Sequence, residues 1–237
     1  MSAPASAVED ASDTATLVWA DAGIIAALLA IDPTGLGGVR LRASPSPART
    51  VFLDRVKALL PPGAAWVKAP AQIDTDRLVG GLDLAATLAA GKPVNAKGVL
   101  AQADGGVLAL AMAERIEPGA AALIAAAMDA QAVRPARGAT AEAAPARFAV
   151  LALDEGVEDE APPAALLDRL AFDLDLRMMR WSALDPWPVD PEAVGAARRR
   201  FPDVTVPHAV AEAQSQTAAG LQIGSVRGEW LALRVAR

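Results

Sequence analysis

The stretch that most constrains the fold is residues 98–113, where a short helical segment and a glycine turn precede an apolar run. Gly98–Ala103 has helical character, Asp104-Gly105-Gly106 forms the turn, and the run from Val107 to Ala113 is unbroken. Such a run after a glycine turn is typical of a strand buried on both faces in a parallel sheet. Open sheets of this kind bind ligands at the carboxyl ends of their strands. A P-loop ATPase carries one or two carboxylates there, whereas this chain carries Ala111 and Met112.

Strands and helices alternate along most of the chain, and the end is all helical. The patterns predict strands over 37–42, 64–68, 107–113, 147–153 and 173–177, and helices over 16–31, 51–60, 82–90, 98–103, 117–131 and 164–170. This alternation predicts an α/β fold with a doubly wound parallel sheet. Three more helices, expected over 192–200, 206–218 and 228–236, predict a small C-terminal helical lid.

The expected domain limits follow from these elements. Residues 1–14 are small and polar and are expected to be disordered, residues 15–185 to form the α/β domain, and residues 190–237 to form the lid. The last helix has no capping residue, so the lid is expected to be truncated.

Composition excludes several classes of function. The formal net charge is −6 and the pI is about 4.9, which argues against a nucleic-acid binder because such proteins need basic patches. The chain has no cysteine and one histidine, His208, so no metal site of thiolates or histidines, no cysteine nucleophile and no catalytic Ser-His-Asp triad is expected. Residues 17–31 are too short to span a membrane and contain Asp21, and no signal peptide precedes them. We therefore expect a cytoplasmic protein without a membrane span.

The segment Ala43–Thr50 lies where a phosphate-binding loop would lie, between the first strand and the next helix. A functional loop has Gly, four residues, and then Gly-Lys-Ser/Thr, because glycines let backbone N–H groups close around phosphates. The corresponding residues are Ala43, Ala48, Arg49 and Thr50, and two prolines in between remove N–H donors. Taken alone, the segment is an ordinary polar loop.

Four further segments resemble magnesium chelatase AAA+ subunits. Residues 76–84 and 98–108 are similar to the family's "DRVVGTLD" and "GLLARANRGIL" segments, while 145–148 and 166–169 read Pro-Ala-Arg-Phe and Leu-Leu-Asp-Arg, as in the family. The similarity runs in one order from about Val39 to Leu176. The resemblance implies an AAA+ sheet of P-loop type with a lid.

The departures from the family pattern resemble its larger, D-type AAA+ component rather than its ATPase subunit. The Walker B carboxylates fall on Ala111 and Met112, and the sensor position falls near Asp154 or Glu155. The resemblance implies a non-catalytic platform for the ATPase subunit in a hetero-oligomeric ring. In bacteriochlorophyll biosynthesis this ring inserts Mg²⁺ into protoporphyrin IX on the porphyrin-binding large subunit. ATP and Mg²⁺ would then be used by the partner, with no cofactor held strongly by this chain. In this family the D-type component continues into an integrin-I-like domain.

Two arginines are candidates for contact with a neighbouring subunit. In AAA+ rings an arginine of one subunit reaches the nucleotide of the next, and Arg169 in the Leu-Leu-Asp-Arg segment is the candidate for this role, with Arg227 a second one. Alternatively, Arg169 is a structural residue that pairs with Asp168 or Asp173. Two other functions also stay open: a drifted P-loop ATPase that still binds nucleotide, and an AAA+-like adaptor of a different ATPase.

Overall fold

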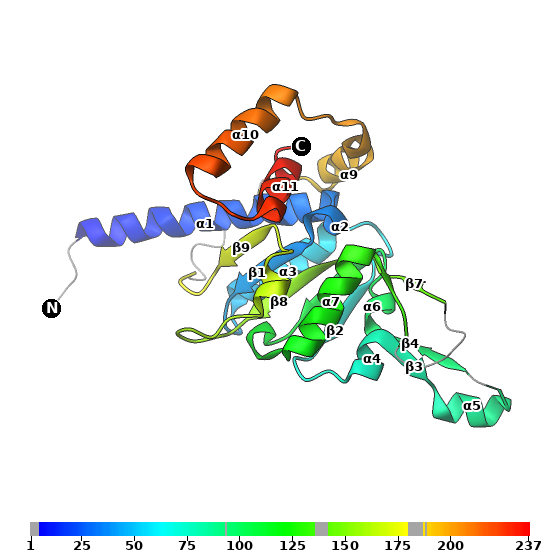
Figure 1. Ribbon diagram of the computed structural model, residues 1–237. Coiled ribbons are helices and arrows are strands. Elements are labelled where there is room, and N and C mark those ends of the chain that lie inside the picture. Colours follow the sequence, from blue (N-terminus) through cyan, green and yellow to red (C-terminus); the bar gives the residue numbers. More distant parts are fainter. Residues whose placement is uncertain (1–4, 93, 136–141, 180–186, 188) are drawn as a thin grey trace.

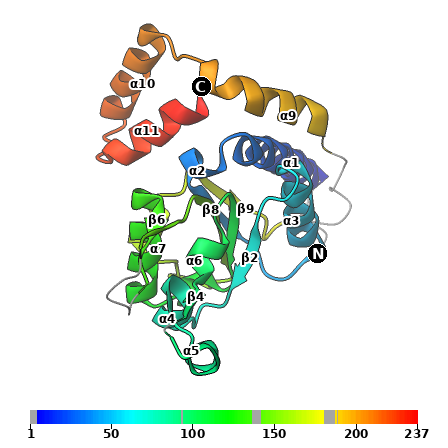
Figure 2. The same ribbon diagram turned by 90° about the vertical axis from the view of Figure 1, so that its right-hand side faces the viewer.

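The computed structural model describes residues 5–92, 94–135, 142–179, 187 and 189–237. A central sheet lies between helices on both faces, three C-terminal helices lie over one end of it, and an arm projects at the other end (Figure 1). Figure 2 shows the same helices α9, α10 and α11 set apart from the sheet by α1 and α2.

The elements have the following bounds. The central sheet contains β1 (Gly38–Arg42), β2 (Trp66–Ala69), β5 (Gly106–Leu110), β8 (Phe148–Asp154) and β9 (Phe172–Asp175). Around it lie α1 (Ala5–Ile31), α2 (Pro33–Leu36), α3 (Pro47–Leu59), α4 (Thr75–Val79), α6 (Val99–Gln102), η1 (Ala113–Arg115), α7 (Pro118–Ala130) and α8 (Ala164–Leu167). Two hairpins are formed by β3 (Gly80–Leu82) with β4 (Asn95–Lys97), which enclose α5 (Leu84–Ala90), and by β6 (Ala132–Val133) with β7 (Ala144–Pro145). The C-terminal part contains α9 (Pro191–Arg200), η3 (Phe201–Asp203), α10 (His208–Gly220) and α11 (Val226–Val235).

The central sheet is parallel throughout and has the order β2-β5-β8-β1-β9. Each strand after the first is reached through a segment that contains helices, as expected for a doubly wound sheet. The predicted α/β class is therefore confirmed. At the start of β1, Gly38 has a φ of +140°, and a Cβ there would lie 1.9 Å from the carbonyl oxygen of Val150 on β8. Only glycine fits where these two strands meet.

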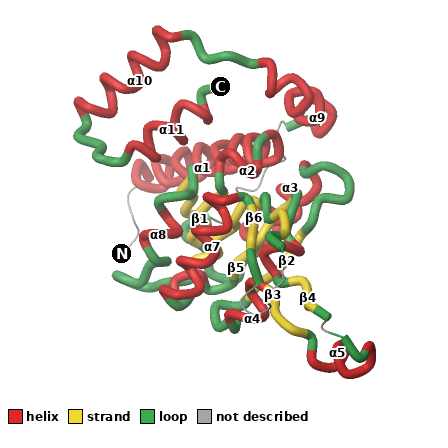
Figure 3. Tube along the Cα trace, turned by 45° about the vertical axis from the view of Figure 1, so that its right-hand side comes forward, coloured by secondary structure: helices red, strands yellow, loops and turns green. Residues whose placement is uncertain are grey.

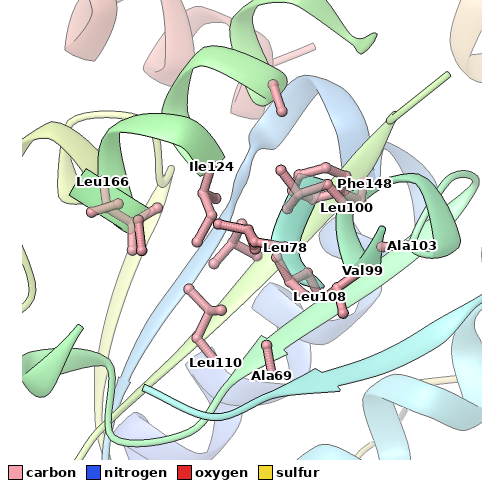
Figure 4. Packing of buried hydrophobic residues seen from close by; sticks show 14 of the residues in the cluster. Ala69, Leu78, Val99, Leu100, Ala103, Leu108, Leu110, Ile124, Phe148 and Leu166 are labelled. Atoms are coloured by element: carbon pink, nitrogen blue, oxygen red, sulfur yellow. The ribbon is translucent and has the colours of Figure 1, made fainter. Parts of the chain in front are cut away.

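Side chains alternate between two hydrophobic cores, one on each face of the sheet. On β5, Leu108 and Leu110 belong to the core beneath α4, α6, α7 and α8, whereas Val107 and Ala109 belong to the core beneath α1 and α3. Figure 4 shows Ile124 and Leu78 packed over Leu110 and Leu108 in the first core. Because both faces are covered, the run 107–110 is apolar throughout rather than alternating.

The neighbouring strands β1 and β8 lead into helices on opposite faces of the sheet. Phe52 and Val56 of α3, which follows β1, are buried in one core, and Leu166 of α8, which follows β8, is buried in the other. Where two adjacent strands lead to opposite faces, an open sheet leaves a crevice at their carboxyl ends. Any site of this fold is therefore expected between the ends of β1 and β8.

Helix α1 is longer than expected, since it begins at Ala5 and includes residues for which composition predicts disorder. By length and composition its segment Thr14–Ile31 could cross a membrane. In the structure one side of it is buried in the core beneath α3 and α9, with the buried residues Trp19, Ala22, Ala26, Leu29 and Ala30. A third of the Thr14–Ile31 segment is buried, and one helix of this kind near the N-terminus is weak evidence for a membrane span.

The C-terminal helices rest on α1, α2 and α3. Arg198 of α9 donates 2.6 Å hydrogen bonds to the carbonyl oxygens of Ala30 and Leu59, at the carboxyl ends of α1 and α3. A cation is favourable at helix carboxyl ends, where unpaired carbonyl groups carry partial negative charge. Burial lowers the pKa of the Arg198 guanidinium. The predicted boundary between the two domains, residues 186–189, includes residues 186 and 188, which lie outside the described residues.

Besides α1, other predicted elements differ from the structure. The strand predicted over 107–113 ends at Leu110, and the loop predicted over 43–50 ends at Ser46, because α3 starts at Pro47. Residues 80–97 form the projecting arm of β3, α5 and β4 (Figure 3), where only one helix is predicted. On this arm Leu88 is 84% exposed.

Candidate functional site

The edge of the sheet at the carboxyl ends of β1, β5 and β8, which we call the crevice, carries the residues at which the family's nucleotide site is expected. These are the segment after β1, the turn after β5 and the residues Asp154 and Glu155 at the end of β8. The backbone joins two of these segments directly, because the N–H group of Ala43 donates a 3.0 Å hydrogen bond to the carbonyl oxygen of Asp154.

The segment Ala43–Thr50 is a helix start rather than an open loop. Ser46 is the N-cap of α3, and its hydroxyl oxygen accepts the N–H of Arg49 at 3.3 Å. Pro47 follows as the first helical residue, where its missing N–H costs nothing. The side chain of Thr50 donates back to the Ser46 carbonyl oxygen at 3.1 Å, and Ala48 is buried. The local sequence therefore favours capping of α3 within the chain.

Arg49 points into the crevice and is paired there. Its Nη1 atom lies 2.5 Å from Oε1 of Glu155 and 3.2 Å from the carbonyl oxygen of Ala43. The Arg49 side chain is 14% exposed and that of Glu155 is 25% exposed. The cation that could face a phosphate is thus bound to a carboxylate of the same chain.

Asp154 is a buried charge held by the first strand. Its side chain is 1% exposed, and Oδ2 accepts Nε and Nη2 of Arg40 at 2.7 Å and 2.6 Å. Oδ1 accepts the N–H of Gly156 at 2.9 Å, and Nε of Arg42 lies 3.9 Å from Oδ2. Charge-assisted bonds of this kind compensate the desolvation of a buried carboxylate.

The end of β5 supplies a carboxylate that sequence analysis missed. Ala111 is the first residue of a turn, and Met112 has a left-handed backbone (φ +49°) and a side chain that is 42% exposed. The turn continues into η1, from which the 1% exposed side chain of Glu114 accepts the N–H of Glu155 at 3.0 Å. The sequence does show a carboxylate at Glu114, directly after the apolar run. Where its side chain lies depends on the turn at Met112, which the sequence pattern did not reveal.

The residues of the crevice differ from those of a magnesium-nucleotide site in two ways. The Arg49 N–H and guanidinium, which lie where a phosphate cradle and its cation are expected, are both bonded within the chain. The turn at Ala111 and Met112 has no oxygen ligand for Mg²⁺ in its side chains.

Arg169 and Arg227 lie in a second cluster that is separate from the crevice. Both bind Asp129 of α7: Nε of Arg169 at 3.0 Å from Oδ1, and Nη1 of Arg227 at 3.0 Å from the same oxygen. Nη2 of Arg169 also binds Oδ2 of Asp129. The partner of Arg169 is therefore neither Asp168 nor Asp173. Asp168 instead binds Nε of Arg227 at 3.1 Å.

These ion pairs change the acidity of Asp129. The hydrogen bond from Arg169 is the largest cause, and with the charge of Arg227 it holds the pKa of the Asp129 carboxyl below its usual range. The structure thus separates the predicted residues into two sets. Residues 43–50, 111–112 and 154–155 follow or end the strands β1, β5 and β8 at one edge of the sheet. Arg169 and Arg227 both bind Asp129.

Several known proteins are similar in sequence to most of this chain. No protein-family model matches it. The chain is 43% identical over 211 residues to the magnesium-chelatase 60 kDa subunit of Cereibacter sphaeroides, which covers 89% of the chain and 34% of that protein. It is 37% identical over 217 residues to the 60 kDa subunit of Rhodobacter capsulatus, covering 89% of the chain and 35% of that protein. The 67 kDa magnesium-chelatase subunit of Chlorobaculum parvum is 34% identical over 145 residues, which are 61% of the chain and 23% of that subunit.

A solved structure has the same fold at low sequence identity. The crystal structure of a "putative ATPase" from Cytophaga hutchinsonii matches 98% of the chain and 82% of its own length with a TM-score of 0.63 and 16% identity. This likeness concerns the fold alone. The chain spans about a third of the length of the 60 kDa relatives. On this sequence similarity over 89% of its length, the chain belongs to the magnesium chelatase family.

Proposed function

We propose that this chain is a non-catalytic AAA+ module of a magnesium chelatase and serves as an assembly platform for the ATPase subunit. In this role it associates with ATPase subunits in a hetero-oligomeric ring in the cytoplasm. The partner uses ATP and Mg²⁺, and its conformational cycle drives insertion of Mg²⁺ into protoporphyrin IX on the porphyrin-binding large subunit, for bacteriochlorophyll synthesis.

The pairing of Arg49 with Glu155 at the end of β8 is the observation that carries this proposal. Arg49 is bound to Glu155, and Ala111 and Met112 stand where a working site has metal and water ligands. Phosphoryl transfer depends on positioning and on neutralisation of phosphate charge by Mg²⁺, Lys and Arg. Without these groups hydrolysis by the chain itself should be absent, which moves the function from the crevice to the surface.

The two arginines on Asp129 support a role at that surface. Arg169 and Arg227 have side chains that are 17% and 38% exposed, so both lie at the molecular surface. Arginine is suited to bidentate contact with phosphate oxygens. We propose that this cluster faces the nucleotide held by a neighbouring ATPase subunit, where a cation stabilises the transition state.

Association with the chelatase ATPase subunit tests the platform role. The chain and the ATPase subunit are mixed with no nucleotide, with MgADP and with a non-hydrolysable ATP analogue, and separated by gel filtration with light scattering. We expect a mixed oligomer with at least one nucleotide state. Failure to associate in every state would contradict the proposal and would favour an adaptor of a different ATPase.

Hydrolysis by the purified chain separates the platform from a drifted ATPase. We expect MgATP turnover no higher than that of the heat-denatured chain. Arg49 lies where a phosphate-binding loop has its lysine, and it keeps a positive charge there. The turnover of the chain is therefore also compared with that of Arg49→Gln. A turnover that this substitution abolishes would establish the drifted ATPase in place of the platform.

A further inference from the structure

Asp129 lies where its own helix disfavours a negative charge. It is in the last turn of α7, directly before the C-terminal residue Ala130 and the left-handed cap Gln131 (φ +52°). The unpaired carbonyl groups at a helix carboxyl end carry partial negative charge, so an aspartate there is destabilising unless cations compensate it. A residue that breaks a local rule in this way points to a role beyond the helix.

The cations that compensate Asp129 come from two different parts of the chain. Arg169 follows α8 in the α/β domain and binds both carboxylate oxygens of Asp129, while its Nη1 donates to the Ala165 carbonyl oxygen at 2.6 Å. Arg227 is in the first turn of α11 and donates to Oδ1 of Asp129 at 3.0 Å. One carboxylate therefore binds an arginine of the α/β domain and an arginine of the C-terminal helices.

A second aspartate completes the connection to α11. Asp168, next to Arg169 in sequence, accepts Nε of Arg227 at 3.1 Å and the hydroxyl of Ser225 at 3.1 Å. Ser225 is the N-cap of α11 and accepts the N–H of Gly228. The start of α11 is thus held against α7 and the end of α8 by these side-chain bonds, and two arginines and two aspartates balance in charge.

We propose that Asp129 is a positioning residue that holds Arg169 and Arg227 as one unit, so that the position of the C-terminal helices controls the arginine pair offered to a neighbouring subunit. When α11 is seated, Asp129 is shared and both guanidinium groups are fixed at the same spot. When α11 moves away, Arg227 leaves with it and Asp129 neutralises Arg169 alone. This inference rests on the proposed function, and it adds the residue that links lid position to the interface.

The test uses substitutions in this chain assembled with the chelatase ATPase subunit. We compare Asp129→Asn, Arg169→Gln and the double variant, with Asp104→Asn as a matched control. Asp104 also binds an arginine through both oxygens, since Nε and Nη2 of Arg147 lie 3.1 Å and 3.2 Å away, but it is not part of the Asp129 cluster. The readouts are kcat and KM for MgATP in the complex, and the dissociation constant of the two proteins.

We expect Asp129→Asn to lower kcat about tenfold, as for the loss of a charge-assisted contact, with KM and the dissociation constant of the two proteins unchanged. The double variant should be no slower than Arg169→Gln, because Asp129 acts through that arginine. Asp104→Asn should behave as the parent chain. A wild-type kcat in Asp129→Asn, or losses that multiply in the double variant, would overturn the proposal.

A measurement on the chain alone keeps this inference separate from the platform role. Amide hydrogen exchange is followed in α11 and in residues 164–171. Asp129→Asn should speed exchange in both segments by about tenfold, whereas Asp168→Asn should affect α11 and leave 164–171 within about twofold. If α11 stays protected from exchange in Asp129→Asn, then Asp129 does not couple Arg169 to α11, and this inference is wrong even when the subunits associate. If exchange speeds up as expected but the subunits do not associate, only the platform role is contradicted.

Discussion

The buried ion pair between Arg40 and Asp154 gives a prediction whose size can be worked from the structure. The substitution Arg40→Met removes the guanidinium that donates to Oδ2 of Asp154 at 2.7 Å and 2.6 Å, while the carboxylate stays 1% exposed. Removing one partner of a buried pair costs roughly 3–5 kcal/mol, because an uncompensated charge remains. Asp154 keeps the Gly156 N–H at 2.9 Å and the distant Arg42, so we expect the lower end, about 3 kcal/mol.

The double variant Arg40→Met/Asp154→Asn separates the cost of the orphaned charge from the value of the pair. The amide that replaces the Asp154 carboxylate has no charge, and its carbonyl oxygen can still accept the Gly156 N–H. Replacement of both charged partners is often close to neutral, so we expect a loss of about 1 kcal/mol from the two changed contacts. The double variant should therefore be more stable than the single one.

Urea unfolding followed by tryptophan fluorescence measures both losses. With a slope of about 3 kcal/mol per M, the single variant should lower the midpoint by about 1 M and the double variant by about 0.3 M. Arg147→Met, which breaks an ion pair whose arginine is 56% exposed, is the control, and its urea midpoint should stay close to that of the parent chain. A single variant that loses less than about 1 kcal/mol, or a double variant as unstable as the single one, would refute this account of the crevice.

Three more predictions follow from individual contacts. Gly38→Ala should prevent normal pairing of β1 with β8, since its Cβ would lie 1.9 Å from the Val150 oxygen; we expect loss of the cooperative urea transition, and a native-like midpoint would contradict this. Arg198→Met should loosen the C-terminal helices by about 2 kcal/mol through two lost carbonyl contacts, seen as faster limited proteolysis of 191–237 with the core unchanged; equal cleavage rates would contradict it. Because the pKa of Asp129 is lowered from 3.8, its ion pairs stabilise fully above that pH and are lost below it. In thermal melts the deficit of Asp129→Asn should be constant above about pH 5 and shrink toward pH 3, whereas a deficit that grows on acidification would reverse the sign.

The sequence was sufficient to predict the class of fold and most of its elements. Alternating apolar and basic residues after a glycine turn marked β1, an apolar run marked β8, and the all-helical end marked α9, α10 and α11. The hydrophobic pattern gave a wrong strand end where the same apolar residues are compatible with either a strand or a turn. Ala111, Met112 and Ala113 continue the apolar run of β5, so hydrophobicity alone could not show that the strand ends at Leu110 and that Met112 turns with a positive φ.

The arrangement of the candidate residues was harder to predict, because it depends on tertiary contacts. The crevice residues could be placed together from strand order, since parallel strands end at one edge of a sheet. The pairing of Arg49 with Glu155 spans 106 residues, and that of Arg227 with Asp129 spans 98. No local pattern encodes such pairs. The position of Asp129 at the end of an alanine-rich helix was visible, but its two partners were not.

We propose as the central claim that this chain does not bind nucleotide, and equilibrium titration of the chain with a fluorescent ATP analogue in the presence of Mg²⁺ tests it most directly. The bond between Arg49 and Glu155 and the absence of carboxylates at Ala111 and Met112 predict no saturable binding up to about 1 mM, which corresponds to less than about 4 kcal/mol of binding free energy. Binding with a micromolar dissociation constant that requires Mg²⁺ and is lost in Arg49→Gln would contradict the account.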